Sequence, residues 1–149
     1  MVLISLLIVS LASAYQTMEE NPMITELETH RKLWQAQNIT SYDYTFNKMC
    51  FCPPPANTPA IISVRNNAIT SVSNPETSQP IDNPEIDFYK SIDQLFEVLE
   101  EAVQRKADRI TVKYDAKLGY PTSIFIDYIK LAADDEVAFS ATDLVVVEN

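Results

Sequence analysis

An alternating run that ends in three prolines, residues 41–55, constrains the fold of this 149-residue chain most strongly. One side of the alternation holds Tyr42, Tyr44, Phe46, Lys48, Cys50 and Cys52, and the other holds Asp43, Thr45, Asn47, Met49 and Phe51. A period of two is that of a β-strand. Because proline has no N–H to donate to a sheet, Pro53-Pro54-Pro55 is expected to end this strand. The pattern predicts a strand over residues 41–52.

Two helices are predicted from apolar side chains at helical spacing. In the first, over residues 23–37, the stripe consists of Met23, Leu27, His30 and Trp34. The second opens with a capping box from Ser91 to Gln94, in which the serine oxygen and the Gln94 side chain each meet an unpaired backbone N–H. Its apolar face consists of Ile92, Leu95, Phe96, Leu99, Ala102 and Val103.

Further strands are predicted around turn signals. Residues 61–65 and 68–72 flank Asn66-Asn67, and because asparagine tolerates positive φ, this pair predicts a two-residue hairpin turn. After a long surface loop over residues 74–87 and the second helix come strands at 109–115, 122–129 and 137–147, the last interrupted near Thr142-Asp143. Gly119 is the only glycine, and we expect it at a left-handed position between the first two of these.

The elements follow the order helix, three strands, helix, three strands, and hairpins join most of them. This order predicts an α+β fold: a single domain over residues 23–149, with a mostly antiparallel sheet of about five to six strands and two helices packed on one face. Residues 15–22 are expected to form a flexible lead-in.

The first residues have the pattern of an export signal. Val2 to Leu11 is apolar apart from two serines, and Ala12-Ser13-Ala14 fits an A-x-A cleavage site, so residues 1–14 are predicted to be a cleaved signal peptide. A buried N-terminal strand or helix is the alternative. The run is too short for a transmembrane span, which needs about 20 apolar residues. We therefore expect a secreted, extracellular protein, or a periplasmic one in a bacterium.

Charge and composition argue against several functions. The chain has 21 acidic and 11 basic residues, a net charge of −10, whereas nucleic-acid phosphates and anionic lipid surfaces are bound by Lys and Arg. Neither nucleic acid nor, after processing, a membrane is an expected partner. A single glycine rules out a Gly-rich phosphate loop, and the common nucleophile and metalloprotease motifs are missing. We predict no cofactor, no metal and no catalytic residue.

Cys50 and Cys52 are the only cysteines, and several interpretations of the pair stay open. Residues i and i+2 of a strand have Cα atoms about 6.5–7 Å apart, at the upper limit for a disulfide. A structural disulfide is favoured because disulfides persist in exported proteins. A redox pair needs an activated thiolate, and Lys48 is the only local cation. Metal binding fits less well, because zinc needs about four ligands and His30 is the only histidine. Intermolecular pairing is the remaining interpretation.

Other candidate sites depend on single features. Asn38-Ile39-Thr40 is an N-glycosylation acceptor in a eukaryotic secretory pathway. Tyr42, Tyr44 and Tyr120 are a candidate binding surface, although such tyrosines are more often half-buried sheet residues. His30 is expected at the margin of its helix stripe.

Acidic side chains suggest two further sites. Loop carboxylates could hold a weakly bound calcium ion, although solvated loop acids are the favoured interpretation. The two candidate sets are Asp82, Glu85 and Asp87, and Asp134, Asp135 and Glu136. An enzyme with dispersed carboxylates would need a cleft in which several side chains converge, from among Asp43, Asp115, Asp127 and Glu136.

Motifs along most of the mature domain recur in order in one protein family. They are Leu33-Trp34, Tyr42 to Phe46 leading to Cys50-Phe51-Cys52, Ser63 to Asn67, Ile92 to Phe96, Val112 to Asp115 and Gly119 to Asp127. On these, the chain resembles the domain-of-unknown-function family 6174, a family of small exported proteins. The hairpin turn here is Asn-Asn where the family tends to have glycine second, and this leader lacks the acceptor cysteine of lipoprotein-like members. The resemblance supports the fold and the cysteine pair and implies no activity.

Two function hypotheses of different classes follow. The first is a secreted, non-catalytic domain that binds a protein or peptide ligand through its sheet face or hairpin tips. The reason is that a rigid scaffold whose reactive side chains do not converge on one site is more often a binding domain than an enzyme. The second is a thiol–disulfide redox protein that acts through Cys50 and Cys52.

Overall fold

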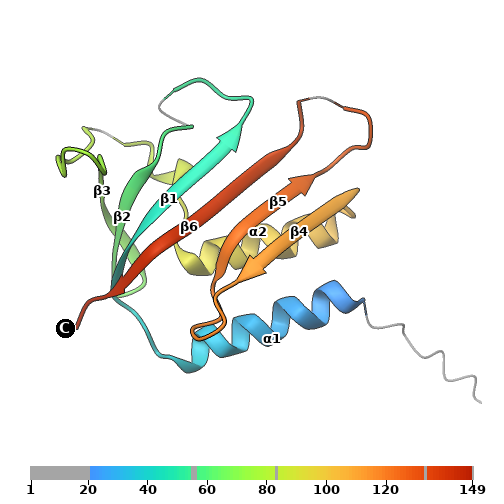
Figure 1. Cartoon of the computed structure of the whole chain (residues 1–149), viewed down its shortest axis with the longest axis horizontal. Coiled ribbons are helices and arrows are strands. Elements are labelled where there is room, and N and C mark those ends of the chain that lie inside the picture. The colour runs from blue at the N-terminus through green and yellow to red at the C-terminus, as the bar shows by residue number, and fades with distance from the viewer. Residues whose placement is uncertain (1–20, 55–56, 83, 133, 149) are drawn as a thin grey trace, which may run out of the picture.

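The computed structural model describes residues 21–54, 57–82, 84–132 and 134–148. In this part of the chain, helices α1 (Pro22–Ala36) and α2 (Ile92–Gln104) pack on one six-stranded antiparallel sheet (Figure 1). The strands are β1 (Tyr42–Cys50), β2 (Ala60–Arg65), β3 (Ala68–Ser73), β4 (Arg109–Tyr114), β5 (Pro121–Asp127) and β6 (Val137–Val146). A short 3-10 helix, η1 (Ile86–Phe88), precedes α2. The predicted α+β class is confirmed.

The signal peptide predicted over residues 1–14 lies outside the described residues, as does most of the lead-in predicted over 15–22. Helix α1 begins at Pro22 rather than Met23, because Asn21 caps it: the Asn21 Oδ1 atom accepts a hydrogen bond from the Met23 N–H at 3.0 Å. None of the described helices is long and apolar enough to cross a membrane.

The strand order is β3-β2-β1-β6-β5-β4, so the N-terminal and C-terminal strands lie side by side in the middle of the sheet (Figure 1). The predicted interruption near Thr142-Asp143 is a bulge within a continuous β6. The register between β1 and β6 shifts between Asp43 and Thr45, and Asp143 has a φ of 55°. Every predicted strand is present, and no strand end is displaced by more than two residues.

The alternation of β1 separates a buried face from an open face. Tyr42, Tyr44 and Phe46 are buried, and the Tyr42 ring meets Trp34 of α1 edge to face at 5.5 Å between centroids. Helix α2 contributes its predicted stripe to the same core, where the buried members are Ile92, Leu95, Phe96, Leu99 and Ala102. Both helices therefore cover one face of the sheet, and the side chains of Asp43, Thr45, Asn47 and Met49 point to the other.

The buried tyrosine hydroxyls hold the start of α2. The Tyr42 Oη atom accepts a hydrogen bond from the Ile92 N–H at 2.9 Å, and the Tyr44 hydroxyl donates to the Lys90 carbonyl. The predicted capping box is confirmed, with reciprocal bonds between Ser91 and Gln94. The N–H groups of Ser91, Ile92 and Gln94, which lack intrahelical partners, are thus satisfied by β1 and by the cap.

Two turns depend on residues with positive φ. Asn66 and Asn67 have φ values of 51° and 65°, as the two central residues of a tight β2–β3 hairpin require. Gly119 has a φ of 86°, and its loop lies against α1. A Cβ atom on Gly119 would lie 2.7 Å from the His30 carbonyl oxygen, so glycine is needed here for space as well as for conformation.

Candidate functional site

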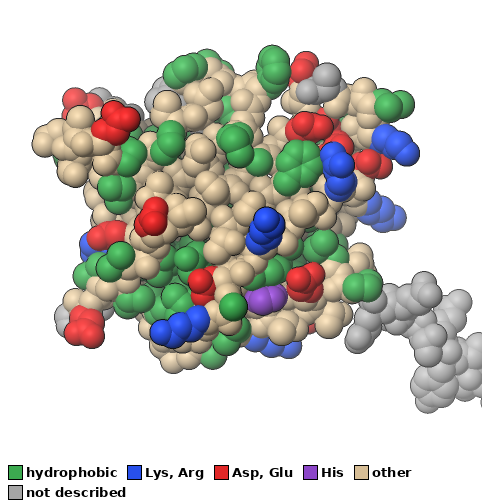
Figure 2. Space-filling model, viewed as in Figure 1, with side chains coloured by type: hydrophobic (Ala, Val, Ile, Leu, Met, Phe, Trp, Pro, Cys, Tyr) green, Lys and Arg blue, Asp and Glu red, His purple; other side chains and the backbone are tan. Residues whose placement is uncertain are grey.

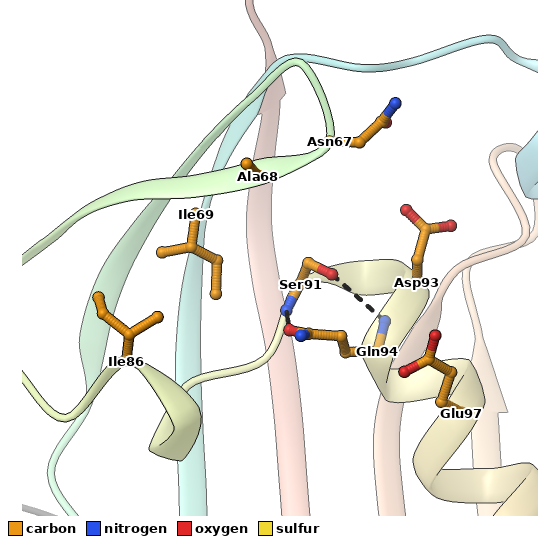
Figure 3. Close-up of a pocket in the computed structure, with 8 residues that line it drawn as sticks. All are labelled: Asn67, Ala68, Ile69, Ile86, Ser91, Asp93, Gln94 and Glu97. Atoms are coloured by element: carbon orange, nitrogen blue, oxygen red, sulfur yellow. Dashed lines mark hydrogen bonds between the residues drawn. The ribbon is translucent and has the colours of Figure 1, made fainter.

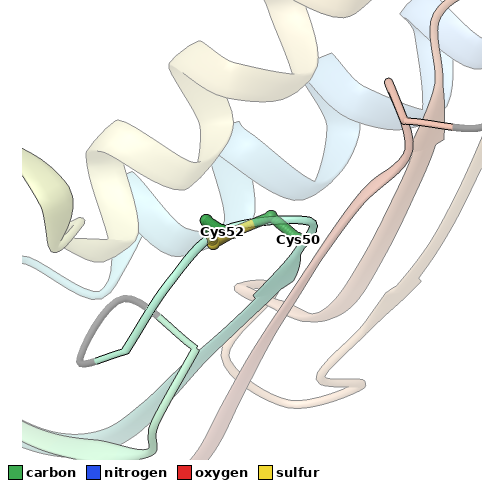
Figure 4. Close-up of a disulfide and its surroundings, with 2 residues drawn as sticks. All are labelled: Cys50 and Cys52. Atoms are coloured by element: carbon green, nitrogen blue, oxygen red, sulfur yellow. A yellow bond between two sulfur atoms is a disulfide. The ribbon is translucent and has the colours of Figure 1, made fainter.

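The disulfide lies where β1 leaves the sheet. The strand ends at Cys50 rather than at the predicted Cys52, and the chain bends at Phe51. Cys50 and Cys52 are bonded to each other, with Cα atoms 5.2 Å apart (Figure 4). This separation is shorter than that of two residues in an extended strand, because Cys52 is no longer part of β1. The bend brings the pair within the usual range for a disulfide, about 4.4–6.8 Å.

The disulfide holds a large aromatic side chain in solvent. Phe51, between the two cysteines, is 88% exposed, and Met49 is 55% exposed. Met49 lies on the open face of β1, and Phe51 follows directly after the end of the strand. The backbone on either side of Phe51 is tied, by the sheet at Cys50 and by the disulfide at Cys52. Phe51 is therefore an exposed aromatic on a constrained backbone.

Next to Phe51, the open face of the sheet contains a hollow of about 310 Å³. Its floor follows from the strand register: Ala138 of β6 lies opposite Met49 of β1 on one side and opposite Phe125 of β5 on the other. A small side chain between two large ones leaves a notch on the sheet surface. Phe51, Cys50 and Val137 complete the apolar lining.

Asp134 and Glu136 form the polar edge of this hollow. Figure 2 shows acidic side chains around the loop between β5 and β6, at the upper right of the view, with Lys and Arg side chains beside them. Among the described residues, no Lys or Arg lines the hollow. Arg109 of β4 stacks on Phe125, with its guanidinium 5.0 Å from the ring centre, and its Nη2 atom lies 3.7 Å from Asp127 Oδ2. Lys130, in the loop between β5 and β6, is exposed and does not line the hollow. The edge of the hollow is therefore acidic.

The predicted binding surface of Tyr42, Tyr44 and Tyr120 is wrong. Their exposed fractions are 0%, 1% and 6%, because all three rings belong to the core under the helices. Tyr120 packs edge to face against Trp34, with the ring centres 6.0 Å apart. Burial raises the pKa of both Tyr42 and Tyr44 above the usual value. The hydroxyls of Tyr42 and Tyr44 therefore bond the start of α2 and do not form a ligand-binding surface.

His30 packs against an edge strand. Its ring stacks on Tyr114 of β4, with centroids 3.9 Å apart and planes 4° apart. Burial, together with the charge of Glu26, raises the pKa of Tyr114 to about 12, against the opposing effect of Arg31. The side chain of His30 is half-buried, as expected for the margin of the α1 stripe.

The acidic residues do not assemble into a single site. Within the described ranges, no three His, Cys, Asp or Glu side chains gather closely enough to hold a metal ion. Asp82, Glu85 and Asp87 are exposed in the loop before α2, whereas Asp134 and Glu136 line the hollow. The Asp135 carboxylate oxygens are buried and accept no hydrogen bond from the described residues.

The four carboxylates considered for an enzyme lie at two ends of the sheet. Asp43 pairs with Arg65 at 2.8 Å, and Asp115 Oδ1 accepts hydrogen bonds from two backbone N–H groups of its own loop. Asp127 and Glu136 lie at the opposite end, where β5 ends and β6 begins. The cleft that such an enzyme would require, with these side chains converging, is therefore not formed.

Asn38 lies at the end of α1. It is exposed, has a φ of 53°, and its Nδ2 atom donates to the Ala36 carbonyl at 3.3 Å. The acceptor amide is therefore accessible to solvent, and its glycosylation stays a prediction.

Another hollow, of about 720 Å³, lies beside the N-terminus of α2 (Figure 3). Three of its polar side chains, those of Ser91, Asp93 and Gln94, already have partners in the fold. Ser91 and Gln94 bond each other's backbone, and Asp93 Oδ1 accepts from the Trp34 Nε1–H at 3.2 Å. We therefore take the hollow beside the disulfide as the candidate functional site.

Sequence reasoning recognised Cys50 and Cys52 but missed their surroundings. The signal that could have found Phe51 and Met49 is the alternation itself, because it places both opposite the buried tyrosines. Ala138 and Phe125 carry no such signal, since only the register of β6 with its two neighbours brings them to Met49.

Comparison with curated proteins and with solved structures finds no match. Comparison with protein families finds one: residues 26–146 match a family described as a family of unknown function (DUF6174). The match covers all six strands, both cysteines and most of α1. The chain therefore belongs to the family of unknown function DUF6174.

Proposed function

We propose that the chain is a secreted, non-catalytic binding domain, and that the hollow beside the disulfide is where it binds a protein or peptide partner. One observation carries the proposal: Phe51 is 88% exposed while the cysteines on both sides of it are bonded to each other. Phe51 and the exposed Met49 line the same hollow, and contiguous exposed apolar surface marks interaction sites.

The energetics favour binding at this position. Covering a fully exposed phenylalanine contributes about 1.5–3 kcal/mol. Because the disulfide already restricts the backbone of Phe51, a partner would order less of the chain on binding. The hollow of about 310 Å³ is at the small end of ligand sites, which suits one or two side chains of a partner better than a cofactor.

Secretion is part of the same proposal. The apolar leader with its Ala-Ser-Ala end directs export, and a disulfide persists in an oxidising compartment outside the cytosol. In that compartment the bond between Cys50 and Cys52 would persist and keep the backbone around Phe51 constrained.

A displayed library of random nine-residue peptides tests the proposal. We expect the oxidised protein to select peptides, and Phe51→Ala to weaken their binding at least tenfold. The matched control is Val145→Ala, because Val145 is also an exposed apolar residue of the sheet but pairs with Asp43 at the far end from the disulfide. Failure to select any peptide, or equal binding by wild type and Phe51→Ala, would overturn the proposal.

Thiol–disulfide exchange is a second candidate function, favoured by one observation. Cys50 and Cys52 line a surface hollow together with Phe51 and Pro53, so a thiolate could approach the bond. In exchange, the incoming thiolate bonds one sulfur and the other leaves as a thiolate. Lys48 offers little activation, because its Nζ atom lies over the Phe88 ring, 4.4 Å from the centre.

Exchange with reduced glutathione separates the two functions. Rapid formation of a mixed disulfide, and a cysteine that alkylates quickly at neutral pH after reduction, would favour redox activity. Slow exchange and slow alkylation would favour the binding function.

A further inference from the structure

We infer that the partner segment is basic: the apolar side chain that enters the hollow is flanked by Lys or Arg in an exposed peptide segment. This inference rests on the proposed function and names the chemistry of the ligand. It follows from the floor of the hollow, the charges at its edge and the lack of Lys or Arg among the described residues that line it.

The floor selects an apolar side chain. Met49, Ala138 and Phe125 form a row across three adjacent strands, and Ala138 leaves a gap in that row. A side chain over Ala138 contacts carbon atoms on three sides, with Phe51 at the end of the hollow. A charged group placed there would lose its hydration without a partner, so the inserted group is apolar.

The edge selects a positive charge beside it. Asp134 and Glu136 line the hollow, and both side chains are exposed enough to meet a ligand. An approaching ammonium or guanidinium group therefore meets acceptors, whereas an approaching carboxylate meets repulsion.

Arg109 of β4 and the exposed Lys130 of the loop between β5 and β6 do not reverse this preference, because neither lines the hollow. Arg109 stacks on Phe125 and its Nη2 atom lies 3.7 Å from Asp127, so its charge is partly balanced within the protein. The net charge of the whole chain, −10, acts in the same direction over longer distances.

The test uses derivatives of one peptide selected from the library. The residues on both sides of its central apolar position are changed to Lys, Ser or Glu, and each fluorescein-labelled peptide is titrated by fluorescence anisotropy in low salt. The protein is expressed with its own leader and kept oxidised. We expect the Lys peptide to bind at least tenfold more tightly than the Glu peptide, with the Ser peptide between them, and 300 mM NaCl to shrink this range.

Matched variants distinguish the edge of the hollow from overall charge. Asp134→Asn with Glu136→Gln should weaken the Lys peptide about fivefold or more and leave the Ser peptide within twofold. Glu85→Gln with Asp87→Asn removes the same charge from another loop and should leave all three peptides within twofold. Equal loss in both double variants would overturn the assignment to Asp134 and Glu136.

The outcomes also separate this inference from the proposed function. If Phe51→Ala weakens the binding of all three peptides, and the wild-type protein binds the three equally, the inference of a basic partner is wrong and the proposed binding site is retained. If no peptide depends on Phe51, both are wrong.

Discussion

Removing the hydroxyl of Tyr42 tests how the sheet holds α2. Tyr42→Phe keeps the buried ring in place and removes the acceptor of the Ile92 N–H, 2.9 Å away. That N–H belongs to the first turn of the helix and has no intrahelical partner. A buried donor left without a partner costs about 1–3 kcal/mol, so the free energy of unfolding at pH 7 should fall by about this amount.

The same substitution should change the alkaline pH dependence. Burial raises the pKa of Tyr42 above its usual value, whereas in the unfolded chain the phenol titrates near its normal pKa of about 10. Above that pH the unfolded state binds fewer protons than the folded state, so stability falls as pH rises toward the raised pKa of the folded state. Each such tyrosine lowers the free energy of unfolding by at most about 1.4 kcal/mol per pH unit. In Tyr42→Phe the contribution of Tyr42 to this fall should be missing.

Urea unfolding followed by circular dichroism measures both effects, at pH 7 and at several values between pH 10 and 11.5. Tyr128→Phe is the control at pH 7, because this half-buried tyrosine makes no hydrogen bond through its hydroxyl to the described residues and stacks with Arg105. We expect it to change stability by less than about 0.5 kcal/mol. Unchanged stability of Tyr42→Phe at pH 7, with an unchanged alkaline slope, would refute the role of the hydroxyl.

Three further predictions concern Gly119, the Asp43–Arg65 pair and the disulfide. Gly119→Ala should lower the free energy of unfolding by about 2–4 kcal/mol, because the added Cβ atom meets the His30 carbonyl at a residue with positive φ. Thermal unfolding measures this loss, with Ala116→Ser in the same loop as the control. The half-exposed Asp43–Arg65 pair should contribute less than about 1 kcal/mol in a double-mutant cycle. Burial opposes ionisation of Asp43, but hydrogen bonds and charge from Arg65 prevail and lower its pKa, so the contribution is full above about pH 4 and is lost as pH falls through the lowered pKa. Cys50→Ser with Cys52→Ser should cost little global stability, because the closed loop is very short, while it weakens Phe51-dependent peptide binding; a loss of folding would contradict this local role.

The elements of the fold could be predicted because their signals are local. The Ser91–Gln94 cap, the Asn66-Asn67 turn and the apolar stripes of both helices each involve residues close in sequence. The left-handed conformation of Gly119 could also be predicted from its place in a short turn between two strands. They could not show that its loop lies against α1, because that contact joins residues far apart in the chain.

The site was harder to predict for two physical reasons. Alternation identifies two faces of a strand, but the helices decide which face is buried, and tyrosine is compatible with either. The sequence therefore left Tyr42 and Tyr44 open as a surface, whereas their hydroxyls bond the start of α2. The hollow itself needs Ala138 of β6 beside Met49 of β1, and no pattern in either segment reports that pairing.

Mapping a bound peptide onto the protein by ¹⁵N chemical shifts tests the central claim most directly, because the position of the ligand is read residue by residue. We predict that the shifts of a library-selected peptide concentrate at residues 49–51, 125 and 134–138, around the hollow beside the disulfide. Shifts concentrated instead at residues 67–69 and 91–97, around the hollow at the start of α2, would contradict it.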